Sequence, residues 1–169
     1  GYEAIGRFDS WEQIANYPVD NDRKGNRTVV PGDIMYKDQN NDGVINYLDE
    51  RPIGYRGDRT PTLNFGINLS ASWKGFDLAM DWTGSGMTSW NQCYETARPF
   101  QNDGNSPDEV LKDALHLSDI WDANSPLIPG KYPMVRLNTD ETSAYDKSSY
   151  WLHNVTYLKL RNLEVGYTF

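Results

Sequence analysis

The sequence has little of several features that would define a function class. It contains one cysteine, Cys93, which excludes an internal disulfide framework and a multi-cysteine metal site. Its two histidines, His116 and His153, do not have the spacing of a zinc site. Acidic residues outnumber basic ones, and the formal charge of −8 argues against nucleic acid, whose phosphates attract clustered Lys and Arg. No run approaches the roughly 18 to 20 apolar residues of a membrane-spanning helix.

Signatures of catalysis are also missing from the sequence. No glycine-rich phosphate loop precedes a helix, and no G-x-S-x-G motif is present. The carboxylate pairs at 77 and 81 and at 119 and 122 have the residue types of a glycosidase acid and base. In a chain with 24 acidic residues, however, close pairs are expected by chance. We therefore predict a protein that is not an enzyme.

Residues 38–49 form the most specific motif in the chain, a calcium-type loop. They fit the template D-x-[DN]-x-[DN]-G with an acidic residue at the twelfth position. Oxygen ligands fall at every second position because they must point inward around the cation, and Gly43 lies where the loop turns sharply. The predicted ligands of a structural Ca²⁺ are Asp38, Asn40, Asp42, the Val44 carbonyl, Asn46 and Asp49. A metal-free loop closed by the same Asp and Asn side chains is the alternative.

The sequence around this loop excludes an EF-hand. That motif needs an amphipathic helix on each side of the loop. Residues 31–37 predict a turn and a short extended segment instead, and Pro52 blocks a helix directly behind the loop. A dockerin would carry two such loops, each followed by a helix, and this chain has one. A secreted or surface calcium-stabilised module that binds carbohydrate or mediates adhesion remains the alternative function.

Residues 63–83 predict an amphipathic β-hairpin. Apolar and polar residues alternate strictly from Leu63 to Trp73, Lys74-Gly75 forms a tight turn, and the return strand continues the alternation to Trp82. Eleven residues match the roughly 9 to 11 of a membrane-spanning β-strand, and Trp73 and Trp82 end the apolar stripes as aromatic girdles do. A soluble antiparallel sandwich also shows such alternation, so both interpretations stay open on the hairpin alone.

The other segments predict short helices and one more strand region. A capping-box pattern at 10–13 predicts one or two helical turns, and Ser106-Pro107 with Glu109 predicts a helix over about 107–121. Alternation over 158–169 slips in phase at Arg161-Asn162, which predicts a β-bulge. Aromatic residues in the intervening loops are candidates for stacking on a sugar or a partner, with filling of small loop cores as the alternative. These candidates are Trp90, Tyr94, Trp121, Tyr132 and Trp151.

Several blocks of sequence, in this order, resemble the SusC/RagA family of TonB-linked outer-membrane proteins of the Bacteroidetes. The first blocks are PGD at 31–33, YKDQNNDGVIN at 36–46, Asp49 and IG at 53–54. The later blocks are PTLNFG at 61–66, WKGFDL at 73–78, SYWLHNVTYLKLRNL at 149–163 and GYTF at 166–169. The similarity spans nearly the whole chain.

The resemblance implies an all-β-dominated fold, namely a piece of a large antiparallel transmembrane β-barrel with long extracellular loops that contain short helices. Residues 1–61 would be an extracellular loop region, 62–83 a barrel hairpin, 84–150 a second long loop region and 151–169 barrel strand. The whole protein would bind nutrients and import oligosaccharides or peptides across the bacterial outer membrane. Its partners would be a SusD-like surface lipoprotein and TonB, the latter through regions outside this chain. The loops would face the cell exterior.

Overall fold

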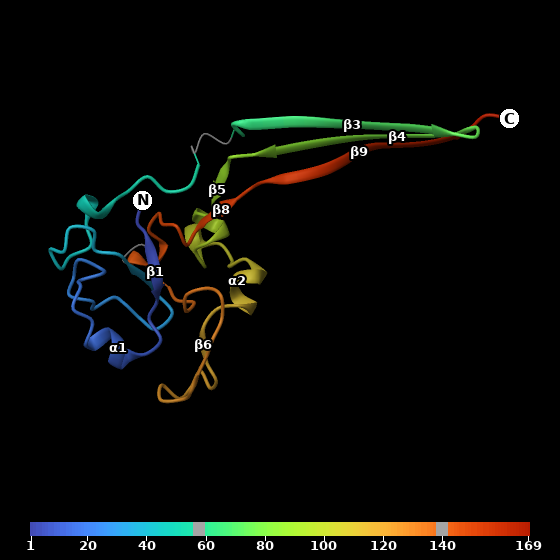
Figure 1. Cartoon of the computed structure of the whole chain (residues 1–169). Helices are drawn as coiled ribbons and strands as arrows, with labels where there is room; N and C mark the ends of the chain where they lie inside the picture. Colours follow the sequence, from blue (N-terminus) through green and yellow to red (C-terminus); the bar gives the residue numbers. More distant parts are fainter. Residues whose placement is uncertain (56–59, 138–141) are drawn as a thin grey trace. The chain divides into compact units, whose positions relative to one another are not determined.

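The computed structural model describes residues 1–55, 60–137 and 142–169 (Figure 1). Most of its regular structure is antiparallel β-sheet with a few short helices, which confirms the predicted β-dominated class. The chain forms two compact units. Unit 1 comprises Gly1–Ile53 and Asn91–Leu152, and unit 2 comprises Gly54–Trp90 and His153–Phe169. Most of the two segments predicted as loop regions thus belongs to unit 1, while the described residues of 54–61 and residues 84–90 belong to unit 2. Residues 56–59 and 138–141 lie outside the described part.

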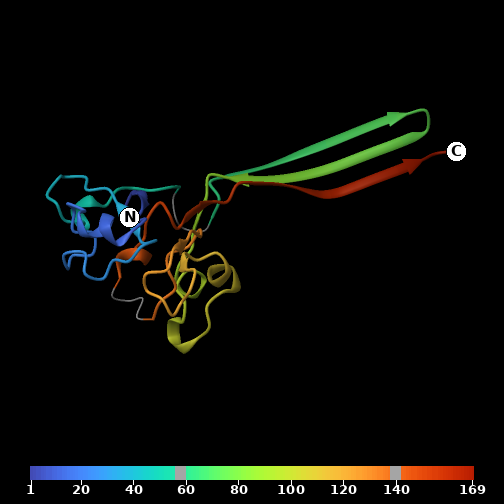
Figure 2. The same cartoon turned by 90° about the horizontal axis from the view of Figure 1, so that it is seen from below.

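Unit 2 is built on three long antiparallel strands in the order β3-β4-β9 (Figures 1 and 2). They are β3 (Leu63–Trp73), β4 (Phe76–Gly86) and β9 (Tyr157–Tyr167), each of 11 residues. The predicted hairpin is confirmed, with pairing from Leu63↔Gly86 to Trp73↔Phe76. Its turn residues Lys74 and Gly75 have φ of 48° and 86°, the left-handed conformations that a two-residue hairpin turn requires. The strands β5 (Ser89–Asn91) and β8 (Leu152–Asn154) form a separate two-stranded sheet.

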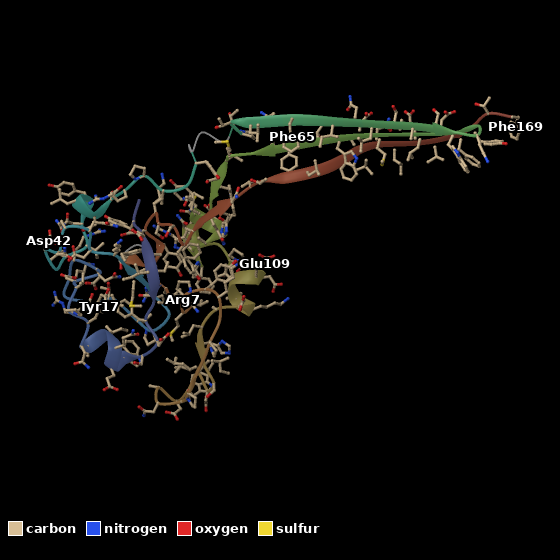
Figure 3. The ribbon with its side chains drawn as sticks, viewed as in Figure 1. Arg7, Tyr17, Asp42, Phe65, Glu109 and Phe169 are labelled. Atoms are coloured by element: carbon tan, nitrogen blue, oxygen red, sulfur yellow. The ribbon has the colours of Figure 1, made fainter. Side chains whose placement is uncertain are left out.

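The strand register gathers the apolar side chains of the long sheet on one face. Directly paired residues of antiparallel strands share a face, and the row Leu69↔Met80↔Leu163 is typical of this sheet. The aromatic ring of Phe65, labelled in Figure 3, covers the paired Gly84. The apolar residues of this face are Leu63, Phe65, Ile67, Leu69, Ala71, Trp73, Phe76, Leu78, Met80, Trp82, Leu158, Leu160, Leu163, Val165 and Tyr167.

A β-bulge at Arg161 preserves this face across β9. Asp81 pairs with Asn162 while Trp82 pairs with Leu160, so Arg161 is the extra residue and the predicted bulge is confirmed. Without it, Leu158 and Leu160 would point to the polar face, because a shift by one residue inverts every side chain. The Arg161 Nε donates to Thr83 Oγ1 at 2.8 Å, which anchors the extra residue.

Unit 1 consists mainly of loops and short elements around a buried core. Its largest buried cluster contains Tyr36, Ile45, Val110 and Trp151, and a smaller cluster forms around Phe8. The short elements are β1 (Ala4–Arg7) paired with β2 (Ile34–Tyr36), α1 (Trp11–Ala15), η1 (Tyr47–Asp49), η2 (Tyr94–Thr96), η3 (Gln101–Asp103), α2 (Asp108–Lys112), β6 (His116–Leu117) paired with β7 (Leu127–Ile128), and η5 (Ser143–Tyr145).

Specific hydrogen bonds hold these short elements in place. Trp151 Nε1 donates to the Ala144 carbonyl at 2.9 Å, and the Tyr36 hydroxyl donates to the Ser143 carbonyl at 2.6 Å. Helix α1 begins as predicted, because Ser10 Oγ accepts the Gln13 N–H at 3.2 Å. Such bonds satisfy buried polar groups in a unit that has little regular structure of its own.

The helix predicted over about 107–121 is much shorter, since α2 ends at Lys112. Beyond it the backbone leaves the helical path and pairs with a later segment. The Leu115 N–H donates to the Tyr132 carbonyl, and the Tyr132 N–H donates to the Asp113 carbonyl, both at 2.9 Å. This pairing buries Ala114 and Leu115, whose spacing from Val110 had suggested a helical face. Tertiary pairing therefore overrides the local helical pattern.

Candidate functional site

Three carboxylates of the calcium-type loop converge in unit 1. Asp38, Asp42 and Asp49 each contribute an oxygen, and these three oxygens all lie within 4.8 Å of one another. A cation that holds its ligands at 2.3–2.6 Å would separate opposite ligands by about 4.6–5.2 Å. The spacing of the three carboxylates therefore fits a shared metal ion.

The loop backbone shapes the site from within. Asp38 accepts the Asn41 N–H at 2.6 Å with one oxygen and the Gly43 N–H at 2.8 Å with the other. Asn41 and Gly43 have φ of 60° and 82°, so the chain turns sharply where the template requires it. Asp42, labelled in Figure 3, accepts the Val44 N–H at 2.9 Å. The Asp and Asn side chains thus wrap the loop around one centre.

Asp49 closes the loop from its far end. Its side chain is fully buried, and its two oxygens accept the N–H groups of Gln39 and Asn46, each at 2.8 Å. Asp49 is also the last residue of η1, and Asn46 caps that turn by accepting the Leu48 N–H at 2.9 Å. The sequence places an acidic residue at the twelfth position, and the structure uses it to join the two ends of the loop.

The two asparagines present amide nitrogens toward Asp42. The Asn40 amide donates to Asp42 Oδ2 at 2.8 Å, and the Asn46 amide donates to the same oxygen at 3.3 Å and to the Val44 carbonyl at 3.1 Å. The hydrogen bond from Asn40, together with the Val44 N–H, lowers the pKa of the Asp42 carboxyl below its ordinary value. The structure therefore brings together the three predicted carboxylate ligands, Asp38, Asp42 and Asp49. Asn40 and Asn46 turn their amide nitrogens toward Asp42, so the structure does not bring their oxygens to the carboxylates.

A second polar loop, over residues 20–28, supports the first, and sequence reasoning treated it only as a connection. The Asp20 N–H donates to the Gly43 carbonyl at 2.8 Å, and the Ile45 N–H donates to the Asp20 carbonyl at 2.9 Å. Ile45 has no exposed surface, so this bridge anchors the candidate metal site to the core. The Asp22 carboxylate organises the second loop by accepting three backbone N–H groups, those of Lys24, 26 and 28. The available signal was the alternation of Asp20 and Asp22 before Gly25.

The five candidate aromatic residues do not form one site. Tyr94 and Trp151 line a common cavity of about 290 Å³ in unit 1. Tyr132 is buried and stacks on Trp151 with ring centroids 6.1 Å apart, so it has a core role. Trp90 belongs to unit 2 and stacks on His153 with ring centroids 5.5 Å apart. Trp121 lies in the connection between β6 and β7, and its side chain is 90% exposed.

The cavity combines aromatic and charged walls. Trp151 stacks on Tyr145 with ring centroids 5.6 Å apart, and Arg98 lies over the Tyr145 ring with its guanidinium carbon 5.9 Å from the centroid. The Asp146 carboxylate forms a salt bridge with the Arg23 guanidinium, with nitrogen and oxygen 2.8 Å apart. Burial raises the pKa of Asp146, against the opposing effect of Arg23. The full lining is Asn91, Gln92, Cys93, Tyr94, Ala97, Arg98, Tyr145, Asp146, Lys147 and Trp151.

Burial also raises the pKa of Tyr145 to about 12, so the Tyr145 hydroxyl stays protonated and uncharged at physiological pH. No periodic pattern or motif in the sequence connects residues 91–98 with 145–151. The cavity arises because the Gln92 N–H donates to the Trp151 carbonyl at 2.8 Å, which joins the two segments. Aromatic content alone could have identified Tyr94 and Trp151, but not Arg98, Asp146 or Lys147.

Comparisons with known proteins add no identification. No protein-family model matches the chain, and no curated protein matches its sequence. Within the described residues, none of the helices has the length and apolar character needed to cross a membrane.

Proposed function

We propose that this chain is part of an outer-membrane nutrient receptor of the SusC/RagA type, in which unit 2 contributes barrel strands and unit 1 contributes extracellular structure. The observation that carries the proposal is the apolar face of the β3-β4-β9 sheet. Its side chains are exposed across all of β3 and β9, with Leu69 49% and Val165 71% exposed. Lipid is the environment in which such a face needs no protein cover.

The dimensions of the sheet support a membrane role. Eleven residues at about 3.3 Å each span about 33 Å from first to last, and a tilt of about 40–45° reduces this to roughly 25 Å. That height equals the apolar band of outer-membrane barrels. The opposite face carries residues suited to water, among them Asn68, Asp81 and Glu164. This is the apolar-out and polar-in pattern of a barrel wall.

The ends of the sheet differ in the way that barrel ends do. At the Lys74-Gly75 turn, the rings of Phe76 and Tyr167 are tilted against each other with centroids 4.6 Å apart. The Phe169 ring packs edge-to-face on Tyr167 at a centroid distance of 5.2 Å. Outer-membrane barrels carry such aromatic girdles at their interfaces, short turns on the periplasmic side and long connections outside. The segments that form unit 1 all connect to the opposite strand ends, so they correspond to the long extracellular connections.

We propose Ca²⁺ as the ion of the loop at 38–49, with a structural role. Calcium takes six to eight oxygen ligands in adaptable geometry, and the three converging carboxylates supply hard oxygens. The site lies on the loop that Asp20 and Ile45 attach to the core of unit 1. Bound calcium would offset the repulsion among the carboxylates and stabilise this connection. No chemical step is assigned to it.

The resemblance supplies the partners of this proposal. A SusD-like lipoprotein would cover the extracellular side, TonB would act through other regions of the protein, and the cargo would be an oligosaccharide or a peptide. Exposed aromatic side chains in unit 1, such as Tyr94 and Trp121, are the surfaces available for cargo or lipoprotein.

Fractionation of source cells with an antibody against this chain tests the proposal. We expect a large, heat-modifiable band in the outer-membrane fraction, because detergent-resistant barrels unfold only on heating. A small band in the soluble or secreted fraction would contradict the receptor and favour the calcium-stabilised binding or adhesion module instead.

A further inference from the structure

A second cavity of unit 1, here called the α1 cavity, lies between the end of α1 and the two polar loops. Its apolar wall consists of Ile14, Ala15, Tyr17 and Pro18, and the loops at 20–28 and 38–49 complete the lining. Among the described residues that line it, Asp20 alone is charged. An apolar wall with one acidic group suits a ligand that is apolar along its length and cationic at its end.

Backbone hydrogen bonds fix Asp20 and leave its carboxylate for a ligand. The Asp20 N–H donates to the Gly43 carbonyl at 2.8 Å, and the Asp20 carbonyl accepts the Ile45 N–H at 2.9 Å. One carboxylate oxygen accepts the Lys24 N–H at 3.1 Å, a neutral donor that leaves the negative charge in place. Within the described part of the chain, no cationic side chain forms an ion pair with Asp20.

A second carboxylate lies beside that of Asp20. The Asp22 side chain interacts with the Asp20 side chain, and it also accepts four hydrogen bonds, from the N–H groups of residues 24, 26 and 28 and the Thr28 hydroxyl. The cationic side chains of this loop, at 23, 24 and 27, are exposed, and none of them belongs to the lining. Neighbouring carboxylates repel each other, so a cation bound at Asp20 relieves an unfavourable interaction.

The apolar wall is held in place by contacts that need no ligand. Tyr17 packs against the fully buried Phe8 with ring planes at 89° and centroids 5.0 Å apart. The Tyr17 N–H donates to the Ile14 carbonyl at 3.2 Å. The Tyr17 side chain, labelled in Figure 3, is half-buried and lines the cavity together with the exposed Pro18. These two rings offer a surface to an aliphatic stem, and a tyrosine ring also attracts an ammonium group.

The volume limits the ligand to a small molecule or to one side chain of a larger one. At about 280 Å³ the α1 cavity lies just below the roughly 300–1,000 Å³ range of ligand pockets. Gly25 and Gly43 keep part of the lining open, because no atom lies within 4 Å of the position that a Cβ would take at either residue. An unbranched alkylammonium chain uses both the apolar wall and the single charge.

We propose that the α1 cavity binds the side chain of a lysine in a peptide, with the aliphatic stem against Tyr17 and Pro18 and the ammonium group on the Asp20 carboxylate. The assignment depends on unit 1 alone, so binding stands whether or not unit 2 enters a membrane. Only the further statement that the imported cargo is a lysine-containing peptide rests on the proposed function.

Three small ligands separate the contributions of charge and stem. The full chain in detergent would be titrated with Nα-acetyl-lysine amide, and binding would be followed by saturation-transfer NMR of the ligand. Nα-acetyl-norleucine amide has a similar stem without the charge, and methylammonium has the charge without the stem. We expect the lysine ligand to reach half-saturation at a concentration about tenfold lower than either control ligand.

Two variants assign the binding to this cavity. Asp20→Asn keeps an oxygen for the Lys24 N–H and removes the charge, so it should weaken the lysine ligand about tenfold and leave the norleucine ligand unchanged. Ala15→Leu fills part of the cavity from the last, exposed position of α1 and should weaken both ligands severalfold, which tests the proposal even if the aspartate variant does not fold. The control Glu109→Gln removes an exposed charge from α2, outside the lining, and should change neither.

Three results would overturn the proposal. These are absence of saturation by the lysine ligand, equal binding of the norleucine ligand, and equal binding of methylammonium, the last of which would indicate a simple cation site. A protein that fails this assay and still fractionates with the outer membrane would retain the receptor function and lose only the lysine site. A protein that binds the lysine ligand and does not fractionate with the outer membrane would retain the site and lose the receptor function.

Discussion

Replacing Leu69 by arginine is the sharpest perturbation of the proposed membrane face. Leu69 is the seventh of the 11 residues of β3, near mid-strand, and lies in the apolar row with Met80 and Leu163. Its neighbour Ser70 points to the opposite face at almost the same depth, in the row with Ala79 and Glu164. Leu69→Arg and Ser70→Arg therefore add the same charge on the two sides of one strand.

The expected effects of the two substitutions differ by more than the error of an unfolding experiment. An arginine on the lipid face near the bilayer midplane costs about 2–4 kcal/mol, and the cost falls to about 0–1 kcal/mol near the interfaces. Ser70→Arg faces water and an acidic neighbour, so we expect a change within about 0.5 kcal/mol. Leu63→Arg, at the end of the same apolar stripe, should fall between them.

The assay is equilibrium unfolding in guanidinium of protein folded into phosphatidylcholine vesicles, followed by tryptophan fluorescence. The predicted order of destabilisation is Leu69→Arg, then Leu63→Arg, then Ser70→Arg. Equal costs for the substitutions at 69 and 70 would refute the argument, because a sheet in water on both faces does not distinguish them by depth. A larger cost at Ser70 would show that the polar face is the buried one.

Three further predictions concern the metal loop, the bulge and acid stability. Calcium at a hundred times its dissociation constant should raise the free energy of unfolding by about 2.7 kcal/mol, measured by calorimetry. Asp42→Asn should remove that gain. Asp49→Asn should also destabilise the calcium-free protein, because the buried Asp49 carboxylate accepts two backbone N–H groups. Deleting Arg161 should abolish insertion into vesicles, measured by protease protection, because Leu158 and Leu160 would then point to the polar face. The control Arg161→Ala keeps the extra residue, so this variant should insert. Burial opposes ionisation of Asp22, but hydrogen bonds led by those from Thr28 outweigh it and lower its pKa below the ordinary 3.8. Its contribution to stability is therefore present above pH 3.8 and lost as the pH falls through the lowered pKa, so Asp22→Asn should cost about 1–3 kcal/mol at neutral pH and flatten the acid limb of an unfolding curve measured against pH.

Local patterns were sufficient for the β3–β4 hairpin, the β-bulge and the candidate metal loop. Period-two alternation identified β3 and β4, and the phase slip located the bulge at Arg161, because both signals depend on which face each side chain takes. The loop at 38–49 was recognisable because its candidate ligands all fall within one stretch of twelve residues. In the hairpin and the loop the interacting residues are close in the chain. The pairing of β9 with β4, such as Tyr167 with Phe76, joins distant parts of the sequence and did not follow from these patterns.

The structure of unit 1 could not be predicted in the same way. Residues 114–115 match a helical face, yet they pair with Tyr132, a contact that local spacing does not reveal. The cavity requires Arg98 and Tyr145 to meet across 47 positions of sequence. Long connections without strong periodicity take their form from such distant contacts, so their core and their candidate ligand site had to be read from the structure.

The most direct test of the membrane proposal is a spin-label scan along β3. Single cysteines would be placed at each position from 63 to 73 in a Cys93→Ser background, and the protein would be reconstituted in lipid. The account predicts a period of two, with odd-numbered positions accessible to oxygen, which partitions into lipid, and even-numbered positions accessible to a water-soluble nickel complex. Equal access of the nickel complex to both sets of positions would contradict it.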